Sequence, residues 1–218
     1  MSEKITILKV LVGSQAHGLA DENSDTDYRA VYVDPTNEIL SLGHKYKGNS
    51  WIEGDEDNTA YEIGHFLHLA TKCNPTILEV FKAPVVEANR DGRKLRELFQ
   101  HVWEPQRSFD AFIGYGFNQR KKFLNKKDNR QNKFACAYIR TLVNLLELLM
   151  TENFSVKVDD MVKPCLLKYK EGYYTVGEVI DKAEEIEERC RKALDDCSHE
   201  ADIDKVNKFL INIRRRYW

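Results

Sequence analysis

The sequence predicts an α+β protein, with a small mixed β-sheet in its N-terminal part and a largely helical C-terminal half. Two strand-like runs rich in apolar and β-branched residues span residues 5–12 and 28–33. Beyond Pro105, most segments repeat their apolar residues with the period of a helix. We therefore expect a boundary near residue 104, between a core of residues 1–104 and a helical domain of residues 105–218.

The remaining elements follow from apolar spacing and from the residues that begin or break helices. A third strand is expected at residues 58–61, after an acidic segment at 51–57. Thr76 is the expected N-cap of a short helix. The expected helices cover residues 62–72, 77–81, 91–102, 109–124, 132–150, 176–196 and 202–216, and residues 154–174 read as irregular or hairpin-like.

Length and composition are those of an ordinary soluble protein. The chain has 218 residues, of which 42% are hydrophobic and 31% charged, with a formal charge of −2. Its 5 cysteines are odd in number and contain no C-x-x-C, which argues against a disulfide framework or a zinc motif. We see no signal sequence and no apolar run long enough to span a membrane. These features predict a cytoplasmic protein without a membrane partner.

The charges are divided unevenly along the chain. Residues 1–60 hold 5 Lys and Arg against 11 Asp and Glu, whereas residues 105–150 hold 9 against 3. This asymmetry fits an acidic metal site opposite a basic wall that could hold phosphates. Ordinary solvated faces would explain the basic half equally well.

The stretch from Gly13 to Asp27 carries most of the chemical information. Gly13 and Ser14 turn the chain after the first strand, and a small turn leaves backbone N–H groups available to a phosphate. Asp25 and Asp27 open the second strand, where alternate side chains share a face and stand about 7 Å apart. Two such carboxylates can hold divalent cations. His17, between turn and acids, could contact a phosphate or fill the turn.

The order of strand, Gly-Ser, Asp-x-Asp and strand resembles the signature of the polymerase-β-like nucleotidyltransferase superfamily. Three stretches, GSQAHGLADENSDTDYRAVYV, DNTAYEIGHFLHLATKCNPTILEVF and KFACAYIRTLVNLLELL, resemble the predicted nucleotidyltransferases of the RNA-repair-pathway polymerase-β-like family. The resemblance covers most of the chain. Thr26 departs from it, because the superfamily usually has an apolar residue between the two acids.

The resemblance implies a metal site completed by a third acid on the strand after the acidic loop. Asp57 is our choice, because it comes just before that strand opens. Glu62 is the alternative, and Asp55 is a weaker candidate. The implied ions are Mg²⁺ or Mn²⁺, bound by Asp25, Asp27 and the third acid.

The resemblance also implies that the helical half offers basic residues to a triphosphate and forms the other wall of a cleft. Lys133 is the first candidate and Arg140 the second; they stand seven residues apart, about two helical turns, and so share a face. Tyr115, Gln119 and Lys122 share a face of the preceding helix and could line the same cleft or a solvated surface.

The C-terminal residues 214–218, Arg-Arg-Arg-Tyr-Trp, combine cationic and aromatic side chains. They could grip nucleic acid, or they could be the cationic end of a helix.

These observations predict metal-dependent nucleotidyl transfer from a nucleoside triphosphate, with release of pyrophosphate. Gly13 and Ser14 would bind the β- and γ-phosphates. The family label suggests an RNA end as acceptor. Two alternatives stay open: a non-catalytic nucleotide or RNA sensor on the same fold, and a transferase that modifies protein or a small molecule.

Overall fold

The computed structural model of the protein describes residues 4–43, 49–51, 58–125 and 130–218. The chain forms two compact units. Unit 1 comprises residues 1–72, 76–103 and 201–218, and unit 2 comprises residues 73–75 and 104–200.

Among the described residues, unit 1 contains one five-stranded sheet in the order β3-β4-β2-β1-β5. Its strands are β1 (Ile5–Val12), β2 (Asp27–Val33), β3 (Asn49–Trp51), β4 (Thr59–Glu62) and β5 (Val85–Ala88). β2 runs parallel to β4, and the other neighbouring pairs are antiparallel. The sheet is therefore mixed, and together with the helices it confirms the predicted α+β class.

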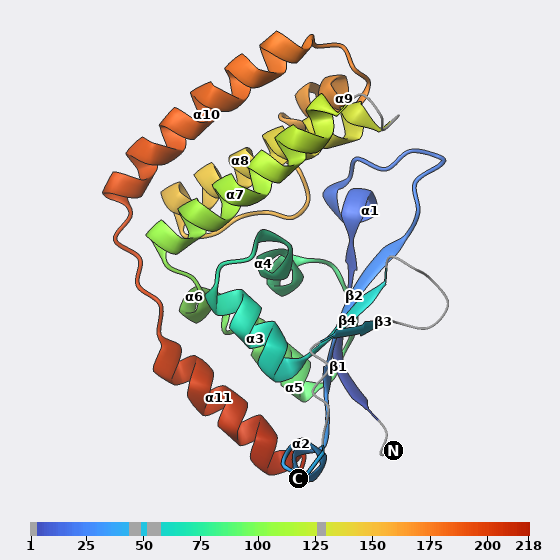
Figure 1. Ribbon diagram of the computed structural model, residues 1–218, viewed down its shortest axis with the longest axis vertical. Coiled ribbons are helices and arrows are strands. Elements are labelled where there is room, and N and C mark those ends of the chain that lie inside the picture. The colour runs from blue at the N-terminus through green and yellow to red at the C-terminus, as the bar shows by residue number, and fades with distance from the viewer. Residues whose placement is uncertain (1–3, 44–48, 52–57, 126–129) are drawn as a thin grey trace. The chain divides into compact units, whose positions relative to one another are not determined.

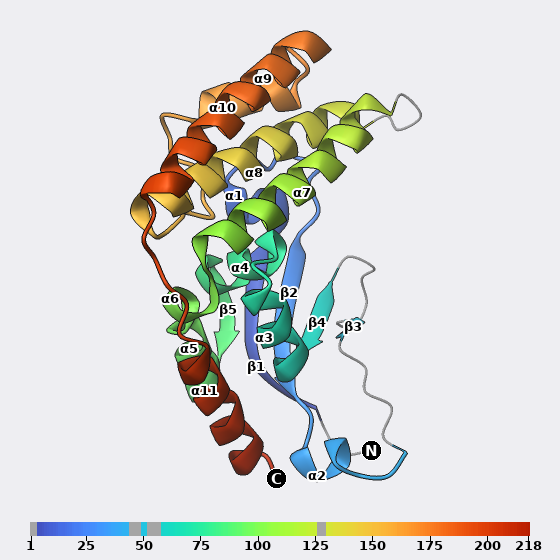
Figure 2. The same ribbon diagram turned by 60° about the vertical axis from the view of Figure 1, so that its left-hand side comes forward.

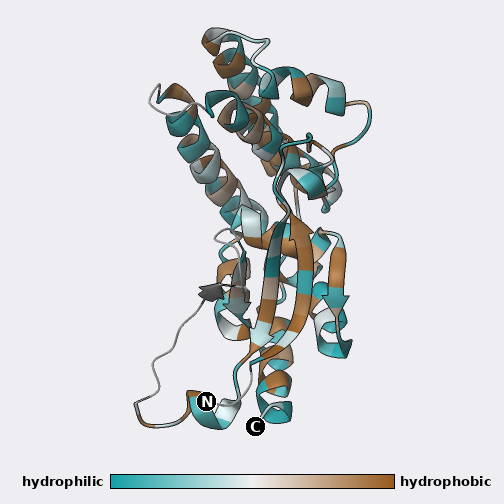
Figure 3. Ribbon diagram, turned by 90° about the vertical axis from the view of Figure 1, so that its right-hand side faces the viewer, coloured by the Kyte–Doolittle hydropathy of each residue, from teal (hydrophilic) through white to brown (hydrophobic). Residues whose placement is uncertain are grey.

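The two central strands, β1 and β2, form the core of the sheet. They pair from Ile5↔Val33 at one end to Val12↔Asp27 at the other. Leu8 and Val31 face each other across this pair and are completely buried. Figure 3 shows hydrophobic stretches along the central strands, interrupted by hydrophilic ones. β-branched and aliphatic residues favour such positions because they pack well on a pleated, covered surface. The bounds predicted for the first strand, 5–12, are confirmed.

The helices of unit 1 include several that cover one face of this sheet. Figure 1 shows α3, α5, α6 and α11 on the same side of the strands. The helices are α1 (Gly13–His17), α2 (Thr36–Ile39), α3 (Ile63–Thr71), α4 (Pro75–Lys82), α5 (Arg90–Arg96), α6 (Phe99–Val102) and α11 (Ile203–Arg216).

The last helix, α11, belongs to unit 1 and not to the helical domain in which the sequence analysis placed it. At its start, Asp202 N donates a hydrogen bond to His101 O, 3.1 Å away. At its end, Thr36 N donates to Tyr217 O at 2.7 Å and Thr36 Oγ1 donates to Arg214 O at 2.6 Å. The domain boundary at residue 104 is therefore corrected for residues 201–218. Local periodicity reports that a helix forms but not which part of the chain it packs against.

Unit 2 is helical throughout its described elements. These are α7 (Pro105–Leu124), α8 (Gln131–Thr151), α9 (Lys163–Lys170) and α10 (Val176–Asp196). Figure 2 shows α7 and α8 packed along their length. The core of the unit comes mainly from α8, whose buried side chains include Tyr138, Ile139, Leu142, Leu145 and Leu148.

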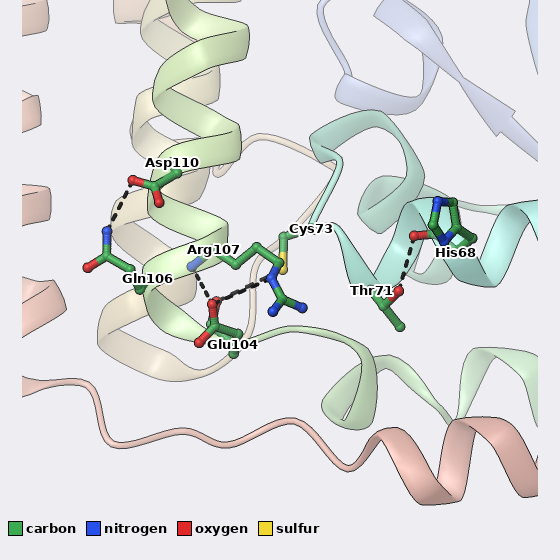
Figure 4. Close-up of polar contacts among 7 residues, drawn as sticks. All are labelled: His68, Thr71, Cys73, Glu104, Gln106, Arg107 and Asp110. Carbon is green, nitrogen blue, oxygen red and sulfur yellow. Dashed lines mark hydrogen bonds and ion pairs between the residues drawn. The ribbon is translucent and has the colours of Figure 1, made fainter.

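Side-chain caps begin two of these helices. Glu104 Oε1 accepts a hydrogen bond of 2.6 Å from Arg107 N at the start of α7, and the same oxygen lies 3.8 Å from Arg107 Nε (Figure 4). Thr175 and Glu178 form a reciprocal capping box at the start of α10. Such caps satisfy backbone N–H groups that have no partner inside the helix.

Four local expectations were wrong. The helix predicted at 91–102 is divided into α5 and α6, with Asn89 as the N-cap of α5. α4 begins at Pro75, so Thr76 lies inside it. β5 was missed because it is a short, mostly exposed edge strand whose place in the sheet depends on its pairing with β1. Part of 154–174 forms α9, whose apolar spacing is short and weak.

Among the described residues, one helix, α8, is long and apolar enough to cross a membrane by length and composition. The expectation that no apolar run is long enough is therefore corrected. In the structure, 67% of the most apolar window of α8 is buried inside the protein.

Candidate functional site

The predicted phosphate turn and one of the predicted acids lie against each other at one end of the sheet. β1 ends at Val12, which pairs with Asp27 at the start of β2, and α1 begins at the next residue, Gly13. A Cβ atom built on Gly13 would overlap Oδ2 of Asp27. Gly13 also has a φ of +68°, in the left-handed region of the backbone map, which residues with a Cβ atom disfavour. Glycine is thus needed here for both backbone conformation and space.

Asp25 stands apart from the sheet. β2 begins at Asp27, so the prediction that Asp25 and Asp27 alternate along one strand was wrong. Asp25 is exposed, whereas Asp27 is half-buried. The chain before Asp25 is closed into a turn in which Asp21 Oδ1 accepts hydrogen bonds from Asn23 N at 3.1 Å and Ser24 Oγ at 3.0 Å. Asp25 therefore lies between this turn and the first residue of β2. Pairing within the sheet orients Asp27 but not Asp25.

Of the two residues considered for the third acid, the structure describes only Glu62. Asp57, and the weaker candidate Asp55, lie outside the described residues. Glu62 is described and is completely buried: Oε2 accepts a 2.7 Å hydrogen bond from Gly64 N, and Oε1 lies 2.6 Å from Arg214 Nη1. Glu62 therefore caps α3 and forms an ion pair with α11.

The register of β2 and β4 separates Glu62 from Asp27. Glu62 pairs with Tyr32, five residues beyond Asp27 along β2. At about 3.3 Å per residue, five residues span roughly 16 Å. A carboxylate at that distance cannot share an ion with Asp27, whose ligands must lie within a few ångströms. This position argues against the alternative choice of Glu62.

The beginning of β4 lies beside the beginning of β2. Thr59 pairs with Arg29, and the buried Asn58 accepts a 2.6 Å hydrogen bond from Tyr28 N through its Oδ1 atom. The described chain upstream of β4 therefore reaches the residue next to Asp27. Asn58 was not singled out from the sequence, because a side chain that pairs with a strand 30 residues away leaves no local pattern.

His17 is held by a carboxylate on another helix. It is buried at the end of α1, and its Nε2 atom lies 3.4 Å from Glu79 Oε1 on α4. Glu79 is itself half-buried. The contact ties the Gly13–His17 helix to α4, which favours a structural role for His17.

The basic candidates of the helical half lie in unit 2 and differ in exposure. Lys133 is exposed near the start of α8, whereas Arg140 is only 9% exposed. On α7, Gln119 is buried, and the exposed Lys122 places its ammonium 5.4 Å from the centre of the Phe134 ring. The three α7 candidates therefore do not form one solvated face.

The cationic C-terminal segment is largely occupied by contacts within unit 1. Arg214 pairs with Glu62, and Arg216 pairs with Asp91. Tyr217 OH donates a 3.0 Å hydrogen bond to Asp91 Oδ2. Exposed Arg215 and Trp218 complete the segment. These contacts favour the structural reading of this helix end.

The acids of the site suit a hard cation. Carboxylate oxygens are the ligands that Mg²⁺ prefers, and the absence of a Cβ at Gly13 leaves room for the Asp27 carboxylate. Among the described residues, no group of three His, Cys, Asp or Glu side chains could hold a metal ion. Asp57 is not among the described residues, so Asp25 and Asp27 are the candidate metal ligands whose positions are known.

A comparison with protein families decides the classification. The model of the RNA repair pathway DNA polymerase beta family matches residues 2–211. The chain belongs to this family. Membership in the RNA repair pathway DNA polymerase beta family agrees with the resemblance seen in the sequence and with the mixed sheet of unit 1. A curated relative is "Uncharacterized protein YcgL" of Bacillus subtilis (strain 168), which is 24% identical over 209 residues. The alignment covers 91% of this chain and 74% of the relative.

Proposed function

We propose that the protein is a metal-dependent nucleotidyltransferase that transfers a nucleotidyl group from a nucleoside triphosphate to an acceptor, with an RNA end as the preferred candidate. The observation that carries the proposal is the packing of Gly13 against the carboxylate of Asp27. It brings a turn that can bind phosphate next to an acid that can bind a cation. The choice of an RNA end as acceptor rests on the description of the family alone.

In the proposed reaction, an acceptor hydroxyl attacks the α-phosphorus of the triphosphate and pyrophosphate leaves. Backbone N–H groups of the turn at Gly13 and Ser14 hold the β- and γ-phosphates. Asp25 and Asp27, with Asp57 as the proposed third acid, would hold the divalent ions. Mg²⁺ or Mn²⁺, when bound, supplies positive charge to the triphosphate and the attacking oxygen. The chain's own contribution is to fix the in-line geometry and the surrounding charge.

The choice of Asp57 is supported by its neighbour in the sequence. Asn58 accepts a hydrogen bond from Tyr28 N, next to Asp27. Glu62, the other choice, is engaged with Arg214 and Gly64. Asp57→Asn should therefore abolish transfer, whereas a loss of Glu62 should act first on stability.

The test is to incubate the protein with each α-labelled nucleoside triphosphate, Mg²⁺ or Mn²⁺, and a pool of RNAs, and to ask what becomes labelled. Labelled RNA would support the proposal, and chelation should reduce the label to background. Label in protein or in a small molecule would assign a different acceptor. No labelled product with any acceptor, despite nucleotide binding, would favour the sensor.

The matched control compares two pairs of acids. Asp25→Asn with Asp27→Asn should remove transfer from a folded protein. Asp195→Asn with Asp196→Asn makes the same change in charge at two exposed positions near the end of α10 and should leave transfer unchanged. Wild-type turnover in the first double variant would refute the assignment of the metal site.

A further inference from the structure

Unit 2 contains a groove of about 670 Å³ that lies wholly within that unit. One wall is a face of α8 that carries Arg140, Asn144, Glu147 and Thr151, at helical intervals of four, three and four residues. Part of the other wall comes from Val158 and from Leu166 of α9. The volume is in the range of sites that hold a small organic molecule.

The segment that forms the second wall is fixed to α8 by hydrogen bonds. Glu147 Oε2 accepts a bond of 3.2 Å from Ser155 N. Thr151 Oγ1 donates to Asn153 O at 2.9 Å. Farther along, Asp159 Oδ1 accepts a 2.7 Å bond from Met161 N. These bonds hold the groove in a preformed shape, which reduces the entropy lost when a ligand binds.

Asn144 is the most buried uncharged polar side chain that lines the groove, at 6% exposed. Its amide makes no side-chain hydrogen bond within the part of the chain that the structure describes, and its nitrogen and oxygen are not among the buried side-chain atoms that lack a partner. The amide is therefore reached from the groove, where a ligand could exchange hydrogen bonds with it in place of water. The amide carries both a donor and an acceptor, and thus fits a ligand that presents both on one edge.

The charges and the apolar walls of the groove further restrict the class of ligand that fits it. Arg140 and Lys157 are matched by the acids Glu147, Asp159 and Asp160. Three acids against two bases do not favour a polyphosphate. Apolar walls suit the faces of a flat ring, whereas Asn144 suits its polar edge.

We propose that this groove binds a nucleobase, with the Asn144 amide hydrogen-bonded to the edge of the base and apolar side chains of α8 and α9 covering its ring. Asn side chains recognise adenine through such paired bonds in other settings. Arg140, which the sequence analysis assigned to the triphosphate, belongs in this groove and would act on the base. The proposal rests on the proposed function, because the base would belong to the triphosphate or to the acceptor RNA of that reaction.

The experiment measures the binding of adenosine, guanosine, cytidine and uridine to the full chain by saturation-transfer NMR, without metal. A small ligand of this size should bind with a dissociation constant on the order of 1 mM. Asn144→Leu should weaken binding of the preferred nucleoside at least about 10-fold. Asn207→Leu, at an exposed position on α11, is the matched control and should not change it.

A second pair of variants tests the groove without touching a buried residue. Met150 lines the groove and is 66% exposed, whereas Met161 is 89% exposed and does not line it. Met150→Trp should block nucleoside binding, and Met161→Trp should preserve it. No binding of any nucleoside to wild type, or equal binding by both tryptophan variants, would overturn the proposal.

Two further arms separate this proposal from the proposed function and identify the source of the base. The double variant Asp25→Asn with Asp27→Asn should lose transfer and keep nucleoside binding. Loss of nucleoside binding in that variant would place the base elsewhere and overturn the groove assignment. Displacement of the nucleoside by a triphosphate, but not by a short RNA, would assign the groove to the incoming nucleotide; the reverse would assign it to the acceptor.

Discussion

Replacing Gly13 by alanine should impair catalysis as well as stability, and Gly43 provides a matched control. Both glycines have positive φ, +68° at Gly13 and +81° at Gly43. A Cβ at Gly43 would meet nothing within 4 Å, whereas a Cβ at Gly13 would overlap Oδ2 of Asp27. Gly43→Ala therefore isolates the cost of the backbone conformation, and Gly13→Ala adds the displacement of the acid.

The magnitudes follow from these two contributions. A left-handed conformation at alanine costs roughly 1–2 kcal/mol. Turning Asp27 away from its rotamer by about 30° adds about 0.5–1.5 kcal/mol. Gly43→Ala should thus lower the free energy of unfolding by the first amount alone, and Gly13→Ala by about 1.5–3.5 kcal/mol. A displacement of a catalytic carboxylate by about 1 Å can reduce the rate about 100-fold.

Urea denaturation measures the two free energies of unfolding, and transfer of a labelled nucleotide measures the rate. Gly13→Ala in the background of Asp27→Ala provides a further check, because the overlap is then absent and only the conformational cost remains. Equal stability losses at Gly13 and Gly43, together with wild-type transfer by Gly13→Ala, would refute the reasoning.

Three other variants test the fold and the helical half. Arg214→Met should cost about 3–5 kcal/mol because it leaves the buried Glu62 without its cation, and a Glu62→Gln, Arg214→Met double variant should recover much of the loss, measured by urea denaturation. Lys133→Ala should lower kcat/KM about 10- to 100-fold if the resemblance assigns it correctly to the triphosphate, whereas exposed Lys208→Ala should not. Burial raises the pKa of Tyr138 to about 12, above its ordinary value of 10.0, so the neutral form is favoured in the fold. The stability that this group contributes is present below pH 10 and is lost between about pH 10 and 12. Tyr138→Phe should therefore make the free energy of unfolding fall less steeply over that pH range, as measured by urea denaturation at several pH values.

Part of the candidate site was predictable from the sequence. The Gly-Ser turn and the acids at the second strand lie within 15 residues, and their types and order carry the family resemblance. Their contact required the pairing of Val12 with Asp27, which brings the end of one strand to the start of the next. The place of Asp25 outside β2 was not predictable, because a strand begins where pairing begins and not where the apolar pattern starts.

The sequence by itself determined the α+β class, the bounds of β1 and the family. Each depends on neighbouring residues, through apolar period, β-branched content or a short motif. Tertiary structure decided the role of Glu62 and the place of α11. Glu62 meets Arg214, and Asp91 meets Arg216 and Tyr217, across more than a hundred residues of chain. A buried carboxylate is stable only with such a partner, and which distant cation supplies it depends on packing that local patterns do not record.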